Sequence, residues 1–221
     1  YTPTNSGGMS TLGFDASFNV RVINKPKWNW DLGFTIGHYD SKVKSLPDTS
    51  IVSSFAGASY ITEVNRTPNL FYGYVANHIF ESDVQAAAEG LSIRQQNGTL
   101  VPFTGGDVRF VDLNKDGIID ENDRTVIGNP NPDFFGSFNT KLSYKNFSLD
   151  ALITFSEGND VYNYTRNQLE AMTDYSNQTQ AVLNRWRDNN HATEIPKTTW
   201  GDPVGNSRFS TRWIEDGSYA R

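Results

Sequence analysis

The sequence contains no cysteine and only three histidines among its 221 residues. Without cysteine the chain forms neither disulfides nor thiolate metal sites. No stretch approaches the roughly 20 consecutive apolar residues that a membrane-spanning helix requires. The net charge of -6, together with the absence of any run of Lys or Arg, argues against a nucleic-acid partner. A hydrophobic content of 37% still permits a transmembrane β-barrel, because barrel strands alternate apolar and polar residues.

Sequence motifs of enzymes are missing as well. The chain has no G-x-S-x-G, H-E-x-x-H or P-loop motif, which leaves no sequence evidence for a nucleophile, a zinc site or a phosphate site. His38, His78 and His191 are scattered and share no ligand spacing. No catalytic residue is therefore predicted, and the chain is expected not to be an enzyme.

Four segments alternate between apolar and polar residues with a period of two, at about residues 11–23, 28–39, 134–144 and 147–156. This period is typical of β-strands with one apolar face. Within these segments the alternation itself covers 12–22, 28–38, 134–144 and 147–155. Each of these runs is about 9–11 residues, the length that a tilted strand needs to cross a bilayer. The apolar positions of the four strands include Phe14, Phe34, Phe138 and Ile153.

The connections between these strands are of two kinds. Residues 24–27 and 145–146 form tight turns, whereas residues of about 40–133 and 157–206 form long loops. Both short turns fall at one end of the strands, as in outer-membrane barrels with short periplasmic turns and long extracellular loops. The predicted fold class is all-β: an antiparallel transmembrane β-barrel segment with long extracellular loops that contain short helices.

Aromatic residues favour the barrel over its main alternative. Trp28, Trp30, Tyr144 and Phe147 lie beside the short turns on the apolar face, where a membrane-interface girdle is expected. The alternative is a secreted, calcium-stabilised β-sandwich that binds carbohydrate or protein, because the strands of a sandwich also have one apolar face. A folded product that is soluble without detergent would favour this alternative.

The long loops contain local signals of their own. Residues 82–85 fit a capping box, which predicts a short helix through residues 86–88 that ends at Gly90. Residues 166–187 permit helix, and the polar stretch 173–179 predicts that they divide into two helices. Loop aromatics are expected to pack within the loops more than to stack on sugars. They include Tyr60, Phe71, Tyr72, Tyr74 and Trp200.

Residues 112–123 match a twelve-residue calcium-binding loop. A hard divalent cation needs six to eight oxygen ligands, and alternate residues of a tightly curled loop can all point inward. Gly117 stands at the sixth position, where the chain turns sharply and a Cβ would be costly. The twelfth residue is Asp where an EF-hand has Glu. The predicted ligands are Asp112, Asn114, Asp116, the Ile118 carbonyl, Asp120 and Asp123.

The predicted cation is Ca²⁺, although the sequence does not distinguish it from Mg²⁺. Only one such loop is present, and no long amphipathic helices flank it, which disfavours a paired calcium switch. The expected role is structural, because a bound ion would order a long loop whose ordering is otherwise costly in entropy.

Several motifs, in the same order along the chain, resemble consecutive signatures of SusC/RagA-type TonB-dependent outer-membrane transporters. The similarity runs through most of residues 10–221. The motifs that carry it are FYGYV at 71–75, DVRFVDLNKDG at 107–117, DRTVIGNPNPDF at 123–134, SYKNF at 143–147 and RWIEDGSY at 212–219.

This resemblance implies that the chain is part of a roughly 22-stranded barrel in a bacterial outer membrane, in contact with lipid and preceded by a plug domain. It implies active import of an oligosaccharide or a peptide, driven by the TonB complex through the plug region. A SusD-like surface lipoprotein would serve as a lid. The plug and the remaining strands would lie outside residues 1–221, and no residue that contacts the substrate is predicted.

Overall fold

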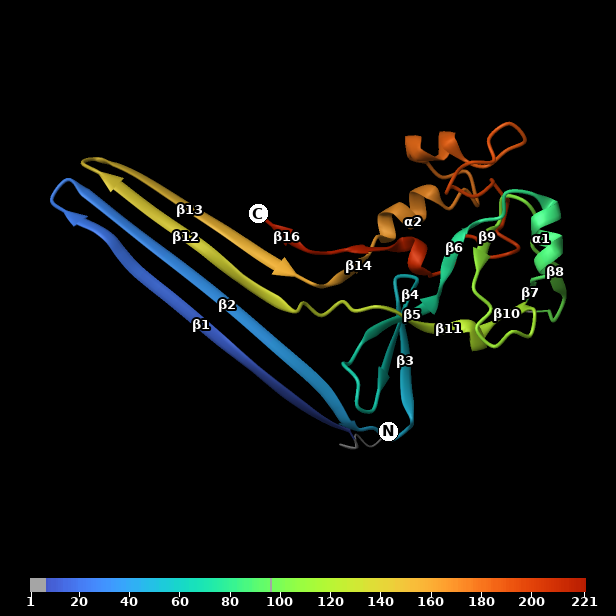
Figure 1. Ribbon diagram of the computed structural model, residues 1–221, viewed down its shortest axis with the longest axis horizontal. Coiled ribbons are helices and arrows are strands. Elements are labelled where there is room, and N and C mark those ends of the chain that lie inside the picture. Colours follow the sequence, from blue (N-terminus) through green and yellow to red (C-terminus); the bar gives the residue numbers. More distant parts are fainter. Residues whose placement is uncertain (1–6, 96) are drawn as a thin grey trace.

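Five strands form one antiparallel sheet in the computed structural model, which describes residues 7–95 and 97–221 (Figure 1). The strand order is β1-β2-β12-β13-β16, so two long hairpins meet where β2 pairs with β12. The predicted all-β, antiparallel fold class is confirmed. The strands of this long sheet are β1 (Gly8–Lys25), β2 (Trp28–Ser45), β12 (Phe134–Tyr144), β13 (Phe147–Glu157) and β16 (Tyr219–Ala220).

The two short connections lie side by side at one end of the long sheet (Figure 1). Only Pro26 and Lys27 separate β1 from β2, and only Lys145 and Asn146 separate β12 from β13. The backbone N–H of Lys145 donates to the Lys27 carbonyl at 2.9 Å, which joins the two turns. Lys145 has a φ of 52°, in the left-handed region that two-residue hairpin turns use.

The long loops fold together at the other end of the sheet (Figure 1), and we call residues 46–133 and 158–218 the loop body. Short strands build four small sheets there, with orders β11-β5-β4-β3, β10-β7-β8, β6-β9 and β14-β15. These strands are β3 (Ser50–Phe55), β4 (Ala58–Glu63), β5 (Leu70–Tyr74), β6 (Ala76–Ile79), β7 (Ser92–Arg94), β8 (Leu100–Pro102), β9 (Val108–Phe110), β10 (Ile118–Ile119), β11 (Arg124–Gly128), β14 (Asp160–Tyr162) and β15 (Ile214–Asp216).

The helices of the loop body are short. The predicted capping is confirmed, because the Ser82 hydroxyl accepts from the Gln85 N–H at 3.3 Å and the helix ends at Gly90, whose φ is 68°. Helical segments also lie on both sides of residues 173–179, as predicted. In the described residues no helix combines the length and the apolar character needed to cross a membrane. The helices are α1 (Asp83–Glu89), α2 (Tyr164–Glu170) and the 3-10 helices η1 (Glu121–Asp123), η2 (Gln180–Asn184) and η3 (Thr211–Trp213).

The hydrophobic core lies in the loop body and is shared by both loops. Phe80 and Phe110 from the first loop are buried in one cluster with Val204 from the second. Phe209 from the second loop packs on Phe71 from the first, with ring centroids 5.8 Å apart. Because both loops contribute side chains to each cluster, they form one folded unit.

Candidate functional site: the apolar sheet face and the acidic loop

One face of the long sheet carries apolar side chains in continuous rows. Phe18, Phe34, Phe138 and Ile153 are successive partners across β1, β2, β12 and β13. Because side chains alternate between faces along each strand, every second residue joins the same surface. Nearer the turns, this surface continues with the rows Val20–Leu32–Thr140–Ala151 and Trp28–Tyr144–Phe147.

No part of the described chain covers this face. Phe14, Phe34, Phe138 and Ile153 are 50%, 40%, 37% and 45% exposed. Apart from Val43, the buried apolar residues all lie outside the long strands. In residues 7–95 and 97–221 no second sheet packs over these strands, so the alternative β-sandwich does not form. An exposed apolar surface of this extent marks contact with a membrane or with protein.

Aromatic side chains gather at both ends of the apolar face. Beside the turns, the Trp28 and Tyr144 rings lie 4.3 Å apart between centroids, and the Trp30 indole N–H donates to Thr140. At the loop end, the His38 ring lies between Phe14 and Phe134, at 6.0 and 5.3 Å. Two such rows match the aromatic girdles at the two interfaces of a membrane barrel.

The opposite face of the long sheet carries polar and charged side chains, and oppositely charged residues pair across neighbouring strands. Arg21, Asp31, Lys141 and Asp150 are successive cross-strand partners and alternate in charge. The Arg21 Nε donates to Asp31 at 2.6 Å, and the Lys141 ammonium lies 3.5 Å from Asp150. A polar face of this kind suits the interior of a barrel.

Residues 112–123, which we call the acidic loop, form hydrogen bonds between their own side chains and backbone N–H groups. Asp112 accepts from the N–H groups of Lys115 and Gly117, at 2.6 and 2.7 Å. Asn114 and Asp116 each accept from the amide two residues further on, at 3.1 and 2.8 Å. Gly117 has a φ of 80°, which confirms the sharp turn predicted at the sixth position.

The end of the acidic loop is closed by two carboxylates. Asp120 caps η1 by accepting from the Asn122 N–H at 2.8 Å. Asp123 is fully buried, and its two oxygens accept from the N–H groups of Leu113 and Asp120, at 2.8 and 2.9 Å. The twelfth residue therefore ties the two ends of the loop together through the backbone.

The carboxylates of the acidic loop do not by themselves provide enough oxygen ligands for a hard cation, so uncharged amide and carbonyl oxygens must be included. Ile118, whose carbonyl is the predicted seventh ligand, lies in β10 and pairs in parallel with Ser92. In the described ranges 7–95 and 97–221, no group of three Asp, Glu, His or Cys side chains is arranged to hold a metal. A cation here would therefore need the Asn114 amide and the Ile118 carbonyl beside the carboxylates.

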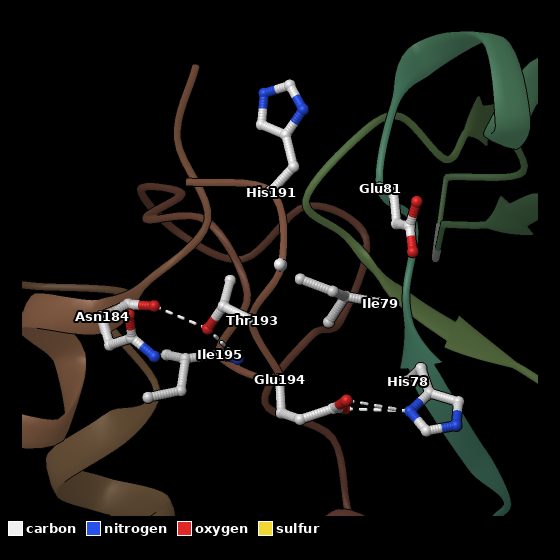
Figure 2. A pocket seen from close by; sticks show the side chains of 9 residues that line it. His78, Ile79, Glu81, Asn184, His191, Thr193, Glu194 and Ile195 are labelled. Carbon is white, nitrogen blue, oxygen red and sulfur yellow. Dashed lines mark hydrogen bonds and ion pairs between the residues drawn. The ribbon is translucent and has the colours of Figure 1, made fainter. Parts of the chain in front are cut away.

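A cavity of about 710 Å³ lies between β6 and residues 184–195 of the loop body (Figure 2). At its edge, the His78 Nδ1 lies 3.0 and 3.1 Å from the two carboxylate oxygens of Glu194. His191 lies elsewhere on the wall and stacks on Trp186, with ring centroids 5.1 Å apart. Sequence reasoning missed the His78–Glu194 contact, because 116 residues separate the partners and no local pattern links them.

Most of the loop aromatics named from the sequence pack against the protein. Trp200 differs, because it is 64% exposed and its ring lies 4.6 Å, between centroids, from that of Tyr175, which is also exposed. The packed residues are Tyr60 and Phe71 in the smaller cluster, Tyr74 against the larger cluster, and Tyr72 beneath the Arg124 guanidinium.

A long antiparallel sheet with one uncovered apolar face, aromatic rows at both ends and a folded loop body defines a segment of outer-membrane β-barrel type. No family model matches the chain. It is 29% identical over 219 residues to the TonB-dependent receptor P3 of Formosa agariphila, covering 98% of this chain and 21% of that protein. It is 26% identical over 162 residues to the TonB-dependent receptor SusC of Bacteroides thetaiotaomicron, covering 72% of this chain and 15% of SusC.

A solved structure of the RagAB peptide transporter matches the fold, with a TM-score of 0.70 and 21% identity over 98% of this chain and 22% of that one. The predicted resemblance is confirmed: the chain is similar in sequence to one segment of TonB-dependent receptors, SusC among them, and its fold matches part of the RagAB transporter. The chain spans about a fifth of the length of two relatives that it matches, the TonB-dependent receptors P3 and P26 of Formosa agariphila, at 21% and 22%. These relatives are named receptors rather than enzymes, in agreement with the expectation that the chain is not an enzyme.

Proposed function

We propose that the chain forms one segment of the wall of a bacterial outer-membrane barrel that imports oligosaccharides or peptides. The observation that carries this proposal is the uncovered apolar face of the long sheet, with tight turns at one end and the loop body at the other. In a barrel this face contacts lipid and the polar face lines the interior. The similarity to TonB-dependent receptors supports the same assignment.

The edges of the long sheet support a larger barrel. β1 is an edge strand with no partner on its outer side in the described residues. The outer side of β13 pairs only near its end, where Phe155 and Ser156 pair with β16 and Thr154 exchanges backbone hydrogen bonds with Arg221. Unpaired backbone groups in hydrocarbon cost several kcal/mol each, so an open edge is not tolerated in a membrane. Further strands of the complete protein would close both edges.

The dimensions of the apolar face fit a bilayer. The ten residue steps of β12 from Phe134 to Tyr144 correspond to roughly 33 Å of strand. A strand tilt of about 40° reduces this length to roughly 25 Å, the height of the apolar band of outer-membrane barrels. The turns would then face the periplasm, and the loop body would lie at the cell surface.

The partners follow from the same assignment. The neighbouring structure is described as a peptide transporter, and we extend peptide import to this chain as one of two cargo classes, beside oligosaccharides. The loop body, at the outer end of the barrel, is positioned to meet a SusD-like lipoprotein that closes over the cargo. Energy would come from the TonB complex through a plug region of the complete protein.

Gene deletion tests this function. Cells without the gene should lose growth on at least one defined oligosaccharide or peptide mixture as sole nutrient, and complementation should restore it. Removing TonB should produce the same loss, because import would be energised. Unchanged growth on both classes of nutrient would contradict import.

The acidic loop is proposed to hold Ca²⁺ as a structural ion. Asp112, Asn114, Asp116, Asp120 and the Ile118 carbonyl are oxygen donors at the spacing of a calcium loop, and Asp123 fixes the ends of the loop. The bound ion would neutralise the carboxylates of Asp112, Asp116 and Asp120 and stiffen the segment that leads from β9 to β11.

A further inference from the structure

Two aromatic side chains of the second long loop stay outside the folded core. Tyr175 is 93% exposed and Trp200 is 64% exposed, and their ring centroids lie 4.6 Å apart with 49° between the ring planes. The loop body buries other aromatic rings, those of Phe80, Phe103 and Phe110 among them. Aromatic rings bind strongly when they are taken out of water, so an exposed pair in contact marks a candidate binding surface.

The backbone holds the two rings side by side. Each ring lies on its own short turn, and the Gly201 N–H donates to the Thr173 carbonyl at 3.0 Å, which ties the turn that carries Trp200 to the turn that carries Tyr175. Gly201 and Asp202 have φ values of 69° and 49°, in the left-handed region, so the chain turns sharply directly after Trp200. The pair is therefore positioned by the backbone while both rings stay accessible.

The chain on either side of the two rings is polar. Residues 173–179 read TDYSNQT and residues 197–202 read KTTWGD. The aromatic anchors of protein–protein interfaces lie instead in an apolar centre from which charged residues are depleted. A sugar ring has an apolar C–H face and hydroxyl groups around its edge, so an aromatic ring among polar groups suits a sugar better than a protein partner.

Further hydrogen-bonding groups lie close to Trp200 along the chain. Gly201, the next residue, forms part of the wall of a cavity of about 560 Å³, and Arg94, Gln95 and Asn97 line the same cavity. The space beside Gly201 is open, because a Cβ at this position would meet no atom within 4 Å beyond its chain neighbours. Guanidinium and amide groups are donors and acceptors that match the hydroxyl groups of a glycan.

We propose that Tyr175 and Trp200 form a stacking platform for a sugar ring of an oligosaccharide. The platform rests on the proposed import function and selects oligosaccharide rather than peptide as the cargo class that this surface binds. Extended peptides are commonly recognised by main-chain hydrogen bonds at the edge of a sheet, and neither ring lies on a strand. At the outer end of the barrel, the platform would meet the oligosaccharide before it enters the interior.

Calorimetry on the complete protein in detergent tests the platform. The probes are maltohexaose, cellohexaose and mannohexaose, with tetra-alanine as the peptide comparison. At least one hexasaccharide should bind, and Trp200→Ala should weaken that binding roughly tenfold, because the larger ring of the pair is lost. Trp200→Phe keeps a flat ring and should stay within about threefold of the unaltered protein. Any affinity for tetra-alanine should be the same in all three proteins.

Phe55→Ala is the matched control. Phe55 is 76% exposed in the same loop body, but it lies on β3 and is not part of the pair. This variant should leave the hexasaccharide affinity unchanged. Tryptophan fluorescence adds a readout that a structural role of Trp200 would not give. The bound hexasaccharide should change the emission of the unaltered protein, and Trp200→Phe should lose most of that change while it still binds.

Three results would overturn the platform. The first is no binding of any of the three hexasaccharides by the unaltered protein, and the second is equal affinity in Trp200→Ala. The third is a structure of the complete protein in which another protein segment covers both rings. If Trp200→Ala does not fold, the fluorescence of Trp200→Phe decides.

The platform and the import function can fail separately. Growth on an oligosaccharide that depends on the gene, together with unchanged affinity in Trp200→Ala, would reject the platform alone. Weakened affinity in Trp200→Ala without any growth that depends on the gene would reject the import function alone.

Discussion

At the scale of single residues, a buried polar network joins the two long loops. The Lys197 ammonium lies 3.0 Å from Asp107, which is 1% exposed, and Asn206 donates to the other oxygen of Asp107 at 3.0 Å. Lys197→Met should weaken local stability by about 3 kcal/mol, because Asp107 would remain buried with its charge uncompensated. Hydrogen exchange of residues 104–108 in the complete protein measures this change.

A second lysine provides the control for that prediction. Lys42 pairs with Asp40 at 3.0 Å, but both side chains are about half exposed. Lys42→Met should therefore change stability by less than about 0.5 kcal/mol. If both variants lost similar stability, or neither did, the Asp107–Lys197 pair would not be the link between the loops.

Another residue-scale prediction concerns acid. Hydrogen bonds from Arg166 and then Asn163 lower the pKa of Glu215 below its usual value of 4.5. A depressed folded pKa contributes stability that is present above the unfolded pKa and is lost as the pH falls through the folded value. The protection factors of the β14–β15 amides, which correct for the slower intrinsic exchange in acid, should therefore fall as the pH drops below about 4.5.

Arg166→Met removes the larger cause of this shift and should flatten that pH dependence. Arg185→Met is the matched control, because Arg185 donates to the Val182 carbonyl rather than to a carboxylate. Identical pH profiles for Arg166→Met and the unaltered protein would show that the Arg166–Glu215 pair does not govern acid sensitivity.

At the scale of elements, the acidic loop gives a prediction about metal removal. A chelator should loosen residues 105–130, because the carboxylates of the loop would repel one another without the ion, while the long strands keep their protection. Limited proteolysis with and without chelator measures the effect, and Asp116→Asn should reduce it by weakening the site. Equal protease sensitivity in both conditions would count against a structural ion.

The long strands could be predicted from the sequence because their alternation of apolar and polar residues is a local pattern. The proposed contact of one face with lipid requires this alternation. Above the apolar band this constraint ends, and β1 and β2 continue to Gly8 and Ser45 beyond the predicted 11–23 and 28–39. There Val43 is buried, and its backbone exchanges hydrogen bonds with Asn65 and Arg66 of the loop body. The alternating pattern of the sequence does not predict this contact.

The loop body could be predicted only where its signals are local. The Ser82 cap, the Gly90 stop and the Gly117 turn depend on a few neighbouring residues, and sequence reasoning found all three. The Asp107–Lys197 and His78–Glu194 pairs join segments that lie far apart in the chain. Such contacts leave no periodic trace, so a single sequence does not reveal them.

At the scale of the whole molecule, the apolar side chains of the chain have two environments. The loop body folds around its own buried core, whereas the long sheet leaves its apolar rows outside. Phe138 and Asn139 are neighbours near the middle of β12 that face opposite sides, Phe138 beside Phe34 and Asn139 beside Gly33. The chain has no cysteine of its own, so single cysteines at these positions can be labelled selectively within it.

The most direct measurement compares spin labels on Phe138→Cys and Asn139→Cys in the complete protein reconstituted into lipid. The label at 138 should collide often with oxygen, which concentrates in hydrocarbon, and rarely with a water-soluble nickel complex. The label at 139 should show a lower ratio of oxygen to nickel collisions. Equal ratios at the two positions, or a nickel-accessible label at 138, would contradict a lipid-facing sheet.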